Sequence, residues 1–380
     1  MTSSIFVTSL IFRPLKRYGG LSLLLWLLSV SPAAASVLMR VAIESGASQV
    51  KVGSSTAATV RDGSGRVLGQ LSPMGGSVAQ SASGQVAIGQ WKAGQIWVEP
   101  GENGQVWIGD GWYRGRVLLM PRNGGLTAIN SVDLEQYLYS VLGAEMGGSW
   151  PQEALKAQAV AARTYALYKR QNNSGELFDL GDDQNSQVYP GVSGESAGTQ
   201  AAVNATAGQV LTYNGRVILA VFHSSSGGHT ENVEDVWENP LPYLRGVPDF
   251  DRGAPVFEWT KTFSAGDLSN RISGVGQITS MTPERTSAHG SVITMKVVGS
   301  GGTRVVSGED IARALGLRST RFRVNRNGSA GNFVVNGRGF GHGVGLSQWG
   351  AYNLANSGYN YQQILAHYYR NTTLARIQMQ

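Results

Sequence analysis

The chain has 380 residues, of which 42% are hydrophobic and none is cysteine. We therefore expect one large or two modest folded domains, with no disulfide and no thiol nucleophile. The formal net charge of +6 permits an anionic partner, but the sequence has no dense Lys/Arg run of the kind that predicts nucleic-acid binding.

Residues 1–35 predict an export signal. Arg13, Lys16 and Arg17 precede an apolar run at 21–30, and Ala33 and Ala35 form an Ala-x-Ala pattern. We place cleavage near Ala35, because this run is short of the roughly 20 residues that a membrane span needs. An uncleaved signal that anchors the chain to a membrane is the alternative.

Residues 36–125 predict a β-rich N-terminal region. Apolar or alternating runs at 37–44, 77–80, 85–91, 95–100 and 105–121 are separated in part by turns rich in Gly and Asn. The 51 glycines of the chain are typical of such a turn-rich organisation.

Residues 126–380 form the second predicted region, which opens with two helices. The first follows Asp133, which with Gln136 fits a capping box, and carries apolar residues at 134, 137, 138, 141 and 142. The second, over 153–170, is Ala-rich, and Ser149 with Gln152 offers its cap.

Further elements follow in chain order. Residues 171–200 are polar and predict a long surface loop, and Asn214-Gly215 predicts a hairpin turn within the strand pattern at 208–228. Strands are predicted at 291–299 and 321–327, and helices at 307–317 and about 359–370.

Glu145 continues the apolar stripe of the first helix, although Gly143 offers an earlier end to that helix. A carboxylate in such a position is partly desolvated, which raises its pKa and suits it to donate a proton as a general acid. The alternative is a structural carboxylate that caps the next helix or pairs with Lys156 or Arg163.

The segment 337–351 contains glycine at every second position from 337 to 345. In extended backbone these glycines share one face, along which a ligand or another backbone can approach closely. Tight packing against the Ala-rich helix is the alternative. His342 on the opposite face offers either a proton shuttle or a local hydrogen bond.

Two more polar segments are candidates for a site. Residues 222–237 hold His223, His229 and three acidic residues without standard zinc spacing, and serines 224–226 without a nucleophile elbow. Residues 182–191, with Tyr189, offer polar groups and an aromatic face for sugars. A turn in the first case and a solvated loop in the second are the alternatives.

With these segments in view, the chain resembles the SpoIID/LytB family of bacterial cell-wall proteins. The resemblance rests on residues 113–117, 129–167, 186–192, 222–237, 308–320 and 337–351, in family order. It implies an exported peptidoglycan lytic transglycosylase of the periplasm or cell wall. It also implies that the family's catalytic Glu is Glu145, although Gly147 stands where the family usually has Pro.

By motif position, the resemblance suggests six substrate-binding residues: Gln187, Tyr189, His223, Ser225, His342 and Gln348. Some members bind zinc through cysteines. Since this chain has none, we expect no metal and no other cofactor.

The expected reaction needs a single carboxylate. Glu145 protonates the oxygen of the MurNAc–GlcNAc bond and then deprotonates the sugar's own 6-hydroxyl, which closes onto the anomeric carbon to leave a 1,6-anhydro end. Ordinary glycosidases need two carboxylates. One alternative is a non-catalytic peptidoglycan-binding activator of a cell-wall amidase, the role described for the LytB branch. A weaker one is a serine hydrolase built on residues 224–226.

The expected fold class is α+β. We expect a β-rich body, a pair of central helices, and a groove lined by the Gly-rich segment. The expected partners are peptidoglycan glycan strands and, in the alternative, a cell-wall amidase.

Overall fold

Two antiparallel sheets dominate the first part of the chain. The computed structural model describes residues 37–377 except 123, 184–185, 238 and 327–331, so the predicted signal at 1–35 lies outside the described residues. The larger sheet has the spatial order β13 (Leu180–Gly181), β1 (Leu38–Ala47), β12 (Gly125–Asp133), β11 (Arg116–Arg122), β8 (Ile96–Pro100), β3 (Ala58–Asp62), β4 (Val67–Leu71).

The second sheet packs on the first through alternate apolar side chains. Its order is β10 (Gly111–Tyr113), β9 (Val106–Ile108), β2 (Gln49–Ser54), β5 (Gly76–Ala82), β6 (Gln85–Ile88), β7 (Trp91–Ala93). Val106 and Ile108 are fully buried while Trp107 between them is not, which is the period of two that a half-buried strand requires. The predicted β-rich region is confirmed, and its sheet continues past residue 125 into β12.

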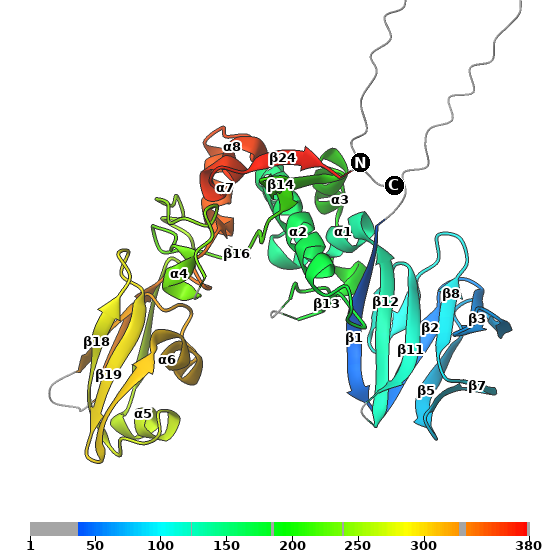
Figure 1. Ribbon diagram of the computed structural model, residues 1–380, viewed down its shortest axis with the longest axis horizontal. Coiled ribbons are helices and arrows are strands. Elements are labelled where there is room, and N and C mark those ends of the chain that lie inside the picture. The colour runs from blue at the N-terminus through cyan, green and yellow to red at the C-terminus, as the bar shows by residue number, and fades with distance from the viewer. Residues whose placement is uncertain (1–36, 123, 184–185, 238, 327–331, 378–380) are drawn as a thin grey trace, which may run out of the picture. The chain divides into compact units, whose positions relative to one another are not determined.

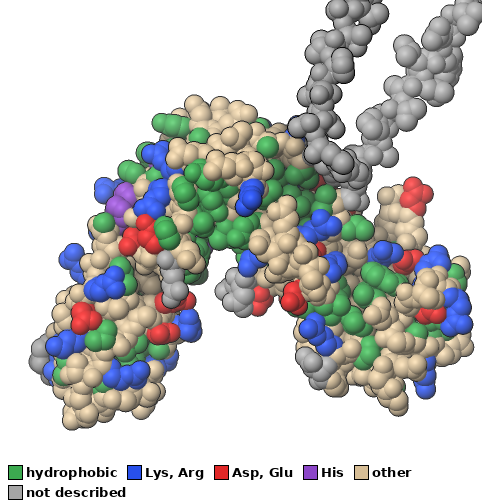
Figure 2. All heavy atoms as spheres, viewed as in Figure 1, with side chains coloured by type: hydrophobic (Ala, Val, Ile, Leu, Met, Phe, Trp, Pro, Cys, Tyr) green, Lys and Arg blue, Asp and Glu red, His purple; other side chains and the backbone are tan. Residues whose placement is uncertain are grey.

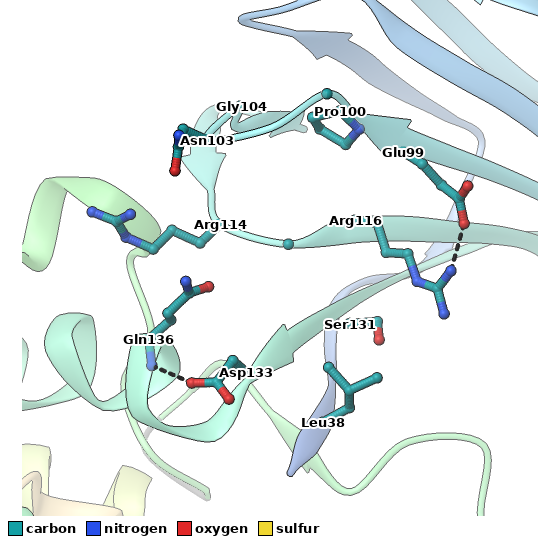
Figure 3. Close-up of a pocket in the computed structure, with 12 residues that line it drawn as sticks. Leu38, Glu99, Pro100, Asn103, Gly104, Arg114, Arg116, Ser131, Asp133 and Gln136 are labelled. Carbon is teal, nitrogen blue, oxygen red and sulfur yellow. Dashed lines mark hydrogen bonds and ion pairs between the residues drawn. The ribbon is translucent and has the colours of Figure 1, made fainter. Parts of the chain in front are cut away.

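Three helices follow and pack on one another: α1 (Leu134–Glu145), α2 (Gln152–Asn172) and α3 (Ala197–Ala205) (Figure 1). The Asp133 side chain accepts hydrogen bonds from the backbone N–H groups of Glu135 and Gln136, at 2.9 and 3.1 Å, which confirms the predicted start of α1. Figure 3 shows this cap at the rim of a cavity of about 480 Å³.

Helix α2 is buried on nearly all sides from Ala154 to Leu167. It contacts α1, α3, α7 (Gln348–Asn356), α8 (Tyr361–Tyr368) and β14 (Gln209–Tyr213). The many alanines explain how so many elements reach one helix, because small side chains allow backbones to approach closely. Because it is buried on nearly all sides and contacts all of these elements, α2 lies at the centre of the larger core of this molecule.

Residues 258–338 build a second, separate hydrophobic core. It lies among two three-stranded sheets and two helices: β17 (Glu258–Phe263), β22 (Phe333–Arg338), β21 (Phe322–Arg326), β18 (Ile278–Thr286), β19 (Val292–Gly299), β20 (Gly302–Ser307), α5 (Ala265–Arg271) and α6 (Gly308–Leu315). The remaining short elements are β15 (Arg216–Val217), β16 (Phe222–His223), α4 (Val233–Val236), β23 (Leu346–Ser347) and β24 (Thr373–Arg376).

The fold is therefore α+β with a β-rich body, as predicted. The hairpin turn is also confirmed, because Asn214 and Gly215 both have positive φ between β14 and β15. No helix among the described residues is long and apolar enough to span a membrane. On the face in Figure 2, basic and acidic side chains are interspersed over the strand-rich parts.

Two sequence predictions about local structure were wrong, and one alternative that the sequence left open is excluded. Helix α2 is capped by Pro151 without a side-chain hydrogen bond, so Ser149 and Gln152 form no capping box. Gly143 does not end α1, which continues to Glu145. Residues 171–200 are no surface loop, because they contain the 3₁₀ turn η1 (Gly191–Gly194) and the start of α3, and hydrogen bonds hold several of their polar groups inside.

Candidate functional site

Glu145 is the last residue of α1 and is half-buried. Leu138, Val141 and Leu142 before it on the same face are fully buried, and they fix the helix against the core. Met146 follows in extended backbone, and its N–H closes the helix onto the carbonyl of Leu142. The carboxylate therefore stands at the C-terminal end of a rigid helix, where the negative end of the helix dipole disfavours further negative charge.

Two amide groups donate hydrogen bonds to Glu145. Nε2 of Gln348 lies 3.0 Å from Oε2 of Glu145, and the backbone N–H of Val188 is the second donor. Burial raises the pKa of Glu145 above its usual value, while the donors Gln348 and Val188 oppose that shift. The surroundings of Glu145 therefore stabilise its protonated form, which is the property that a general acid needs.

The two cations that could have neutralised Glu145 are engaged elsewhere. The fully buried guanidinium of Arg163 binds Glu135 with two short hydrogen bonds, of 2.8 and 2.5 Å. Lys156 binds Glu153 at 2.7 Å. Among the described residues, no salt bridge involves Glu145.

Gln348 reaches Glu145 because α7 begins at that residue. The Ser347 side chain caps α7 by accepting from the N–H of Gly350 at 3.2 Å. Ser347 and Leu346 form strand β23, which pairs in parallel with His223 and Phe222 of β16. The segments 222–223 and 346–348 therefore lie side by side, and Gln348 of the second contacts the carboxylate of Glu145.

The Gly-rich segment is not an extended ribbon, so that prediction was wrong. Gly339, Gly341, Gly343 and Gly345 all have positive φ, a left-handed conformation in which the glycines do not line one face of a strand. They pack closely on the segment around residues 221–227. A Cβ on Gly339 would lie 2.6 Å from the carbonyl oxygen of Ser225.

His223 and His342 are neutral side chains held by backbone groups. Nδ1 of His223 donates to the carbonyl of Val344 at 3.1 Å. Nδ1 of His342 accepts from the N–H of Val344 at 3.1 Å, so its Nε2 carries the hydrogen that is donated to Phe222 at 3.0 Å. Burial lowers the pKa of His223 to about 4 and that of His342 to about 3. Both rings are therefore in their neutral form near neutral pH, and each uses its single N–H in a hydrogen bond to a backbone carbonyl.

The serines of this segment are bound to carboxylates rather than to a base. The hydroxyl of Ser225 is buried and donates to Asp251 at 2.5 Å, and that of Ser226 donates to Asp249 at 2.6 Å. A serine nucleophile needs a histidine that accepts its proton. The hydroxyls of Ser225 and Ser226 donate to aspartates and not to Nε2 of His223, so the geometry gives no support to a serine hydrolase built on them.

Gln187 and Tyr189 are buried beneath the site. Gln187 accepts from the hydroxyl of Tyr137 at 3.1 Å and donates to the carbonyl of Ala162 at 3.3 Å. The Tyr189 hydroxyl donates to Asn130 at 2.9 Å, and its ring packs on Tyr137. These contacts of Gln187 and Tyr189 fix the position of Val188 between them, whose backbone N–H donates to Glu145.

Sequence reasoning missed an aromatic cluster beside these residues. Trp150, Trp349 and Tyr352 are half-buried, with ring centroids 4.8 to 5.2 Å apart. Trp349 directly follows Gln348, and Trp150 lies five residues after Glu145. Their proximity in sequence to two candidate site residues was a signal that could have found them.

Two of the three acidic residues at 231–235 belong to ion pairs, and the third, Asp235, accepts a hydrogen bond from Asn232. Glu231 binds Arg321 at 2.7 Å, and Glu234 binds Arg245 at 2.7 Å. His229 stacks on His289 with ring centroids 3.5 Å apart. In the described part of the chain, no group of three or more His, Asp or Glu side chains is arranged to hold a metal ion.

Comparison with known proteins identifies the family. The sequence model described as "Stage II sporulation protein" (SpoIID) matches residues 122–213, and a "Domain of unknown function (DUF8618)" matches 249–345. Stage II sporulation protein D of Bacillus subtilis is 36% identical over 273 residues, which cover 65% of this chain and 76% of the relative.

Two further relatives extend this result. An uncharacterized protein of Brachyspira hyodysenteriae is 32% identical over 270 residues, which cover 69% of this chain and 72% of the relative. The amidase enhancer of B. subtilis is 29% identical over 290 residues, which cover 62% of this chain but 40% of the relative. The chain belongs to the SpoIID/LytB family, and its role is related to the bacterial cell wall.

Proposed function

We propose that this chain is an exported peptidoglycan lytic transglycosylase in which Glu145 is the general acid and base. The observation that carries the proposal is the environment of that carboxylate. It stands at the end of α1 with amide donors and without a cation, and burial raises its pKa. The protonated group donates to the glycosidic oxygen of a MurNAc–GlcNAc bond, which breaks the bond to the anomeric carbon.

The second half of the reaction uses the same group. The carboxylate left behind accepts the proton of the sugar's 6-hydroxyl, whose oxygen bonds to the anomeric carbon and yields a 1,6-anhydro end. The two donors of Glu145 are amides, so no second carboxylate joins it through the hydrogen bonds seen at this site. This agrees with a one-carboxylate reaction, whereas inverting and retaining glycosidases use two carboxylates.

The test is mass spectrometry of glycan fragments. Residues 36–380 would be incubated with intact and with amidase-stripped peptidoglycan, beside the Glu145→Gln variant. We expect anhydro-ended fragments from the wild type, and a rate lower by about 10²–10⁴-fold in the variant, the usual contribution of general acid–base catalysis. Equal cleavage by both proteins would overturn the proposal.

A second candidate is a non-catalytic activator of a cell-wall amidase, because one relative is named amidase enhancer. It predicts that a purified amidase is stimulated equally by the wild type and by Glu145→Gln, with no cleavage of glycan by either. The same variant therefore separates the two functions.

A further inference from the structure

Two neighbouring cavities on the β-rich body share a pair of tryptophans. Trp107 of β9 and Trp112 of β10 are directly opposite one another in the β9–β10 pair. Their rings lie edge to face with centroids 5.2 Å apart. Both rings line a cavity of about 340 Å³ and a second cavity of about 600 Å³. The two cavities thus meet at this tryptophan pair.

The smaller cavity exists because its floor lacks side chains. Gly53 pairs with Trp107 across β2 and β9, and a Cβ on Gly53 would lie 2.9 Å from the carbonyl oxygen of Gly75. Met74 at the same cavity has φ 56° and is 72% exposed. Its exposed side chain adds apolar area to the tryptophan face of the cavity.

The larger cavity adds polar groups to the aromatic ones. Asp110, Asp182 and Ser193 line it together with Trp112. Carboxylates and a hydroxyl beside an indole ring suit a sugar, because the C–H face of the sugar ring packs on the aromatic ring while its hydroxyl groups donate to the carboxylates.

The larger cavity adjoins the candidate catalytic residue. Val188 lines it, and the N–H of Val188 is a donor to Glu145. The turn η1, which also lines it, packs directly on α1, since Ser140 donates to the carbonyl of Gly191 at 2.5 Å. The surface from Trp107 to Val188 is therefore continuous with the end of α1.

We propose that Trp107 and Trp112 form a binding subsite for N-acetylated amino-sugar units of a glycan strand whose bond beside Glu145 is cleaved. Both tryptophans precede the part of the chain that the SpoIID family model matches, which starts at residue 122. The inference rests on the proposed function for its substrate class. Such a subsite would give a long glycan strand a second point of attachment, which holds the strand in place while the carboxylate of Glu145 acts on it.

The test measures binding rather than cleavage. Calorimetry in the Glu145→Gln background would compare an octamer and a trimer of β-1,4-linked N-acetylglucosamine. We expect Trp112→Ala to weaken octamer binding by about tenfold, the usual scale of one buried aromatic contact, and to leave trimer binding unchanged. Trp112→Phe, which keeps a ring, should retain most of the affinity.

Trp97→Ala is the matched control. Trp97 lies in β8 of the same body, under Arg116 and outside both cavities, so its loss should leave the affinity for the octamer unchanged. Equal octamer affinity in folded Trp112→Ala and Trp97→Ala would overturn the subsite. So would Trp112-dependent binding of an apolar peptide in place of the glycan. Absence of cleavage by the wild type with Trp112-dependent glycan binding would overturn the proposed function and support the subsite.

Discussion

Helix α1 carries a glutamate near each end, and the two glutamates have opposite environments. Glu135 in the first turn binds the buried guanidinium of Arg163 and accepts from the N–H of Gly208. Glu145 in the last turn has amide donors and no cation partner among the described residues. Glu135 is therefore held in an ion pair at the N-terminal end of α1, whereas burial at the C-terminal end raises the pKa of Glu145. The difference separates a structural glutamate from a candidate acid.

Replacement of Arg163, which pairs with Glu135 at the N-terminal end of α1, should have the largest effect on stability. Arg163→Met would leave Glu135 without its partner, and we expect a loss of about 3 kcal/mol or more in the free energy of unfolding. Urea unfolding checks this. Cleavage per folded molecule should be unchanged, and the double variant with Glu135→Gln should recover part of the loss. A normal stability with lost cleavage would reverse the roles assigned to the two glutamates.

His223 extends the comparison to a buried group held in its neutral form. Its pKa is about 4 in the folded protein, against about 6.5 for an ordinary histidine. Below pH 6.5 the unfolded chain binds a proton that the folded chain does not, so stability falls as pH falls through this window. Relative to His223→Asn, the wild type should lose about 2.5 kcal/mol between pH 7 and pH 4.5. Parallel stability curves of the two proteins would contradict the assignment.

A variant of Gln348 tests the hydrogen bonds that Glu145 accepts at the C-terminal end of α1. Gln348→Leu removes a hydrogen bond that lowers the pKa of Glu145, so that pKa should rise further. Since the acid works in its protonated form, the alkaline limb of the pH–rate profile should move to higher pH. The loss of one charge-assisted hydrogen bond should lower the maximal rate by roughly tenfold. A shift of the limb to lower pH would show that Gln348 acts otherwise.

The smallest expected effect is that of Glu145, at the C-terminal end of α1, on the stability of the protein. Burial raises the pKa of Glu145, so its ionisation costs stability above that pKa, and the cost fades as pH falls below the value of an ordinary glutamate. Glu145→Gln should therefore stabilise the protein at neutral pH by about 1 kcal/mol, as replacement of strained functional groups often does. At pH 4 the two proteins should unfold alike. A destabilised variant at pH 7 would mean that the carboxylate is structural.

The sequence was sufficient to predict α1 and the partly buried position of Glu145. Asp133 is a strong helix start, and the stripe from Leu134 to Leu142 has the helical period, so the position of Glu145 on the buried face followed from spacing alone. These are local signals, which a single stretch of chain carries within itself.

The partners of Glu145 could not be predicted in the same way. Gln348 is 203 residues away, and its approach depends on the pairing of β16 with β23 and on the cap at Ser347. Tyr189 was expected to offer an aromatic face to a sugar, with a solvated loop as the alternative, but its side chain is buried and its hydroxyl donates to Asn130 inside the core. Such burial is decided by tertiary contacts, to which composition gives no access.

The glycines at 339–345 show a third limit. Their alternation fits an extended strand, yet glycine alone also tolerates the left-handed conformation that the chain adopts there. Contact with the segment around Ser225 decides between the two, because a side chain at Gly339 or Gly345 would strike that backbone. A spacing of two therefore indicated the need for glycine correctly and the backbone conformation wrongly.

The most direct test of Glu145 as the single acid and base is cleavage of purified glycan strands in ¹⁸O-labelled water, followed by mass spectrometry. We predict new ends that are anhydro, lighter by one water than reducing ends, and free of ¹⁸O, formed by the wild type and absent with Glu145→Gln. New reducing ends that carry ¹⁸O would mean that water is the nucleophile, and they would contradict the one-carboxylate mechanism.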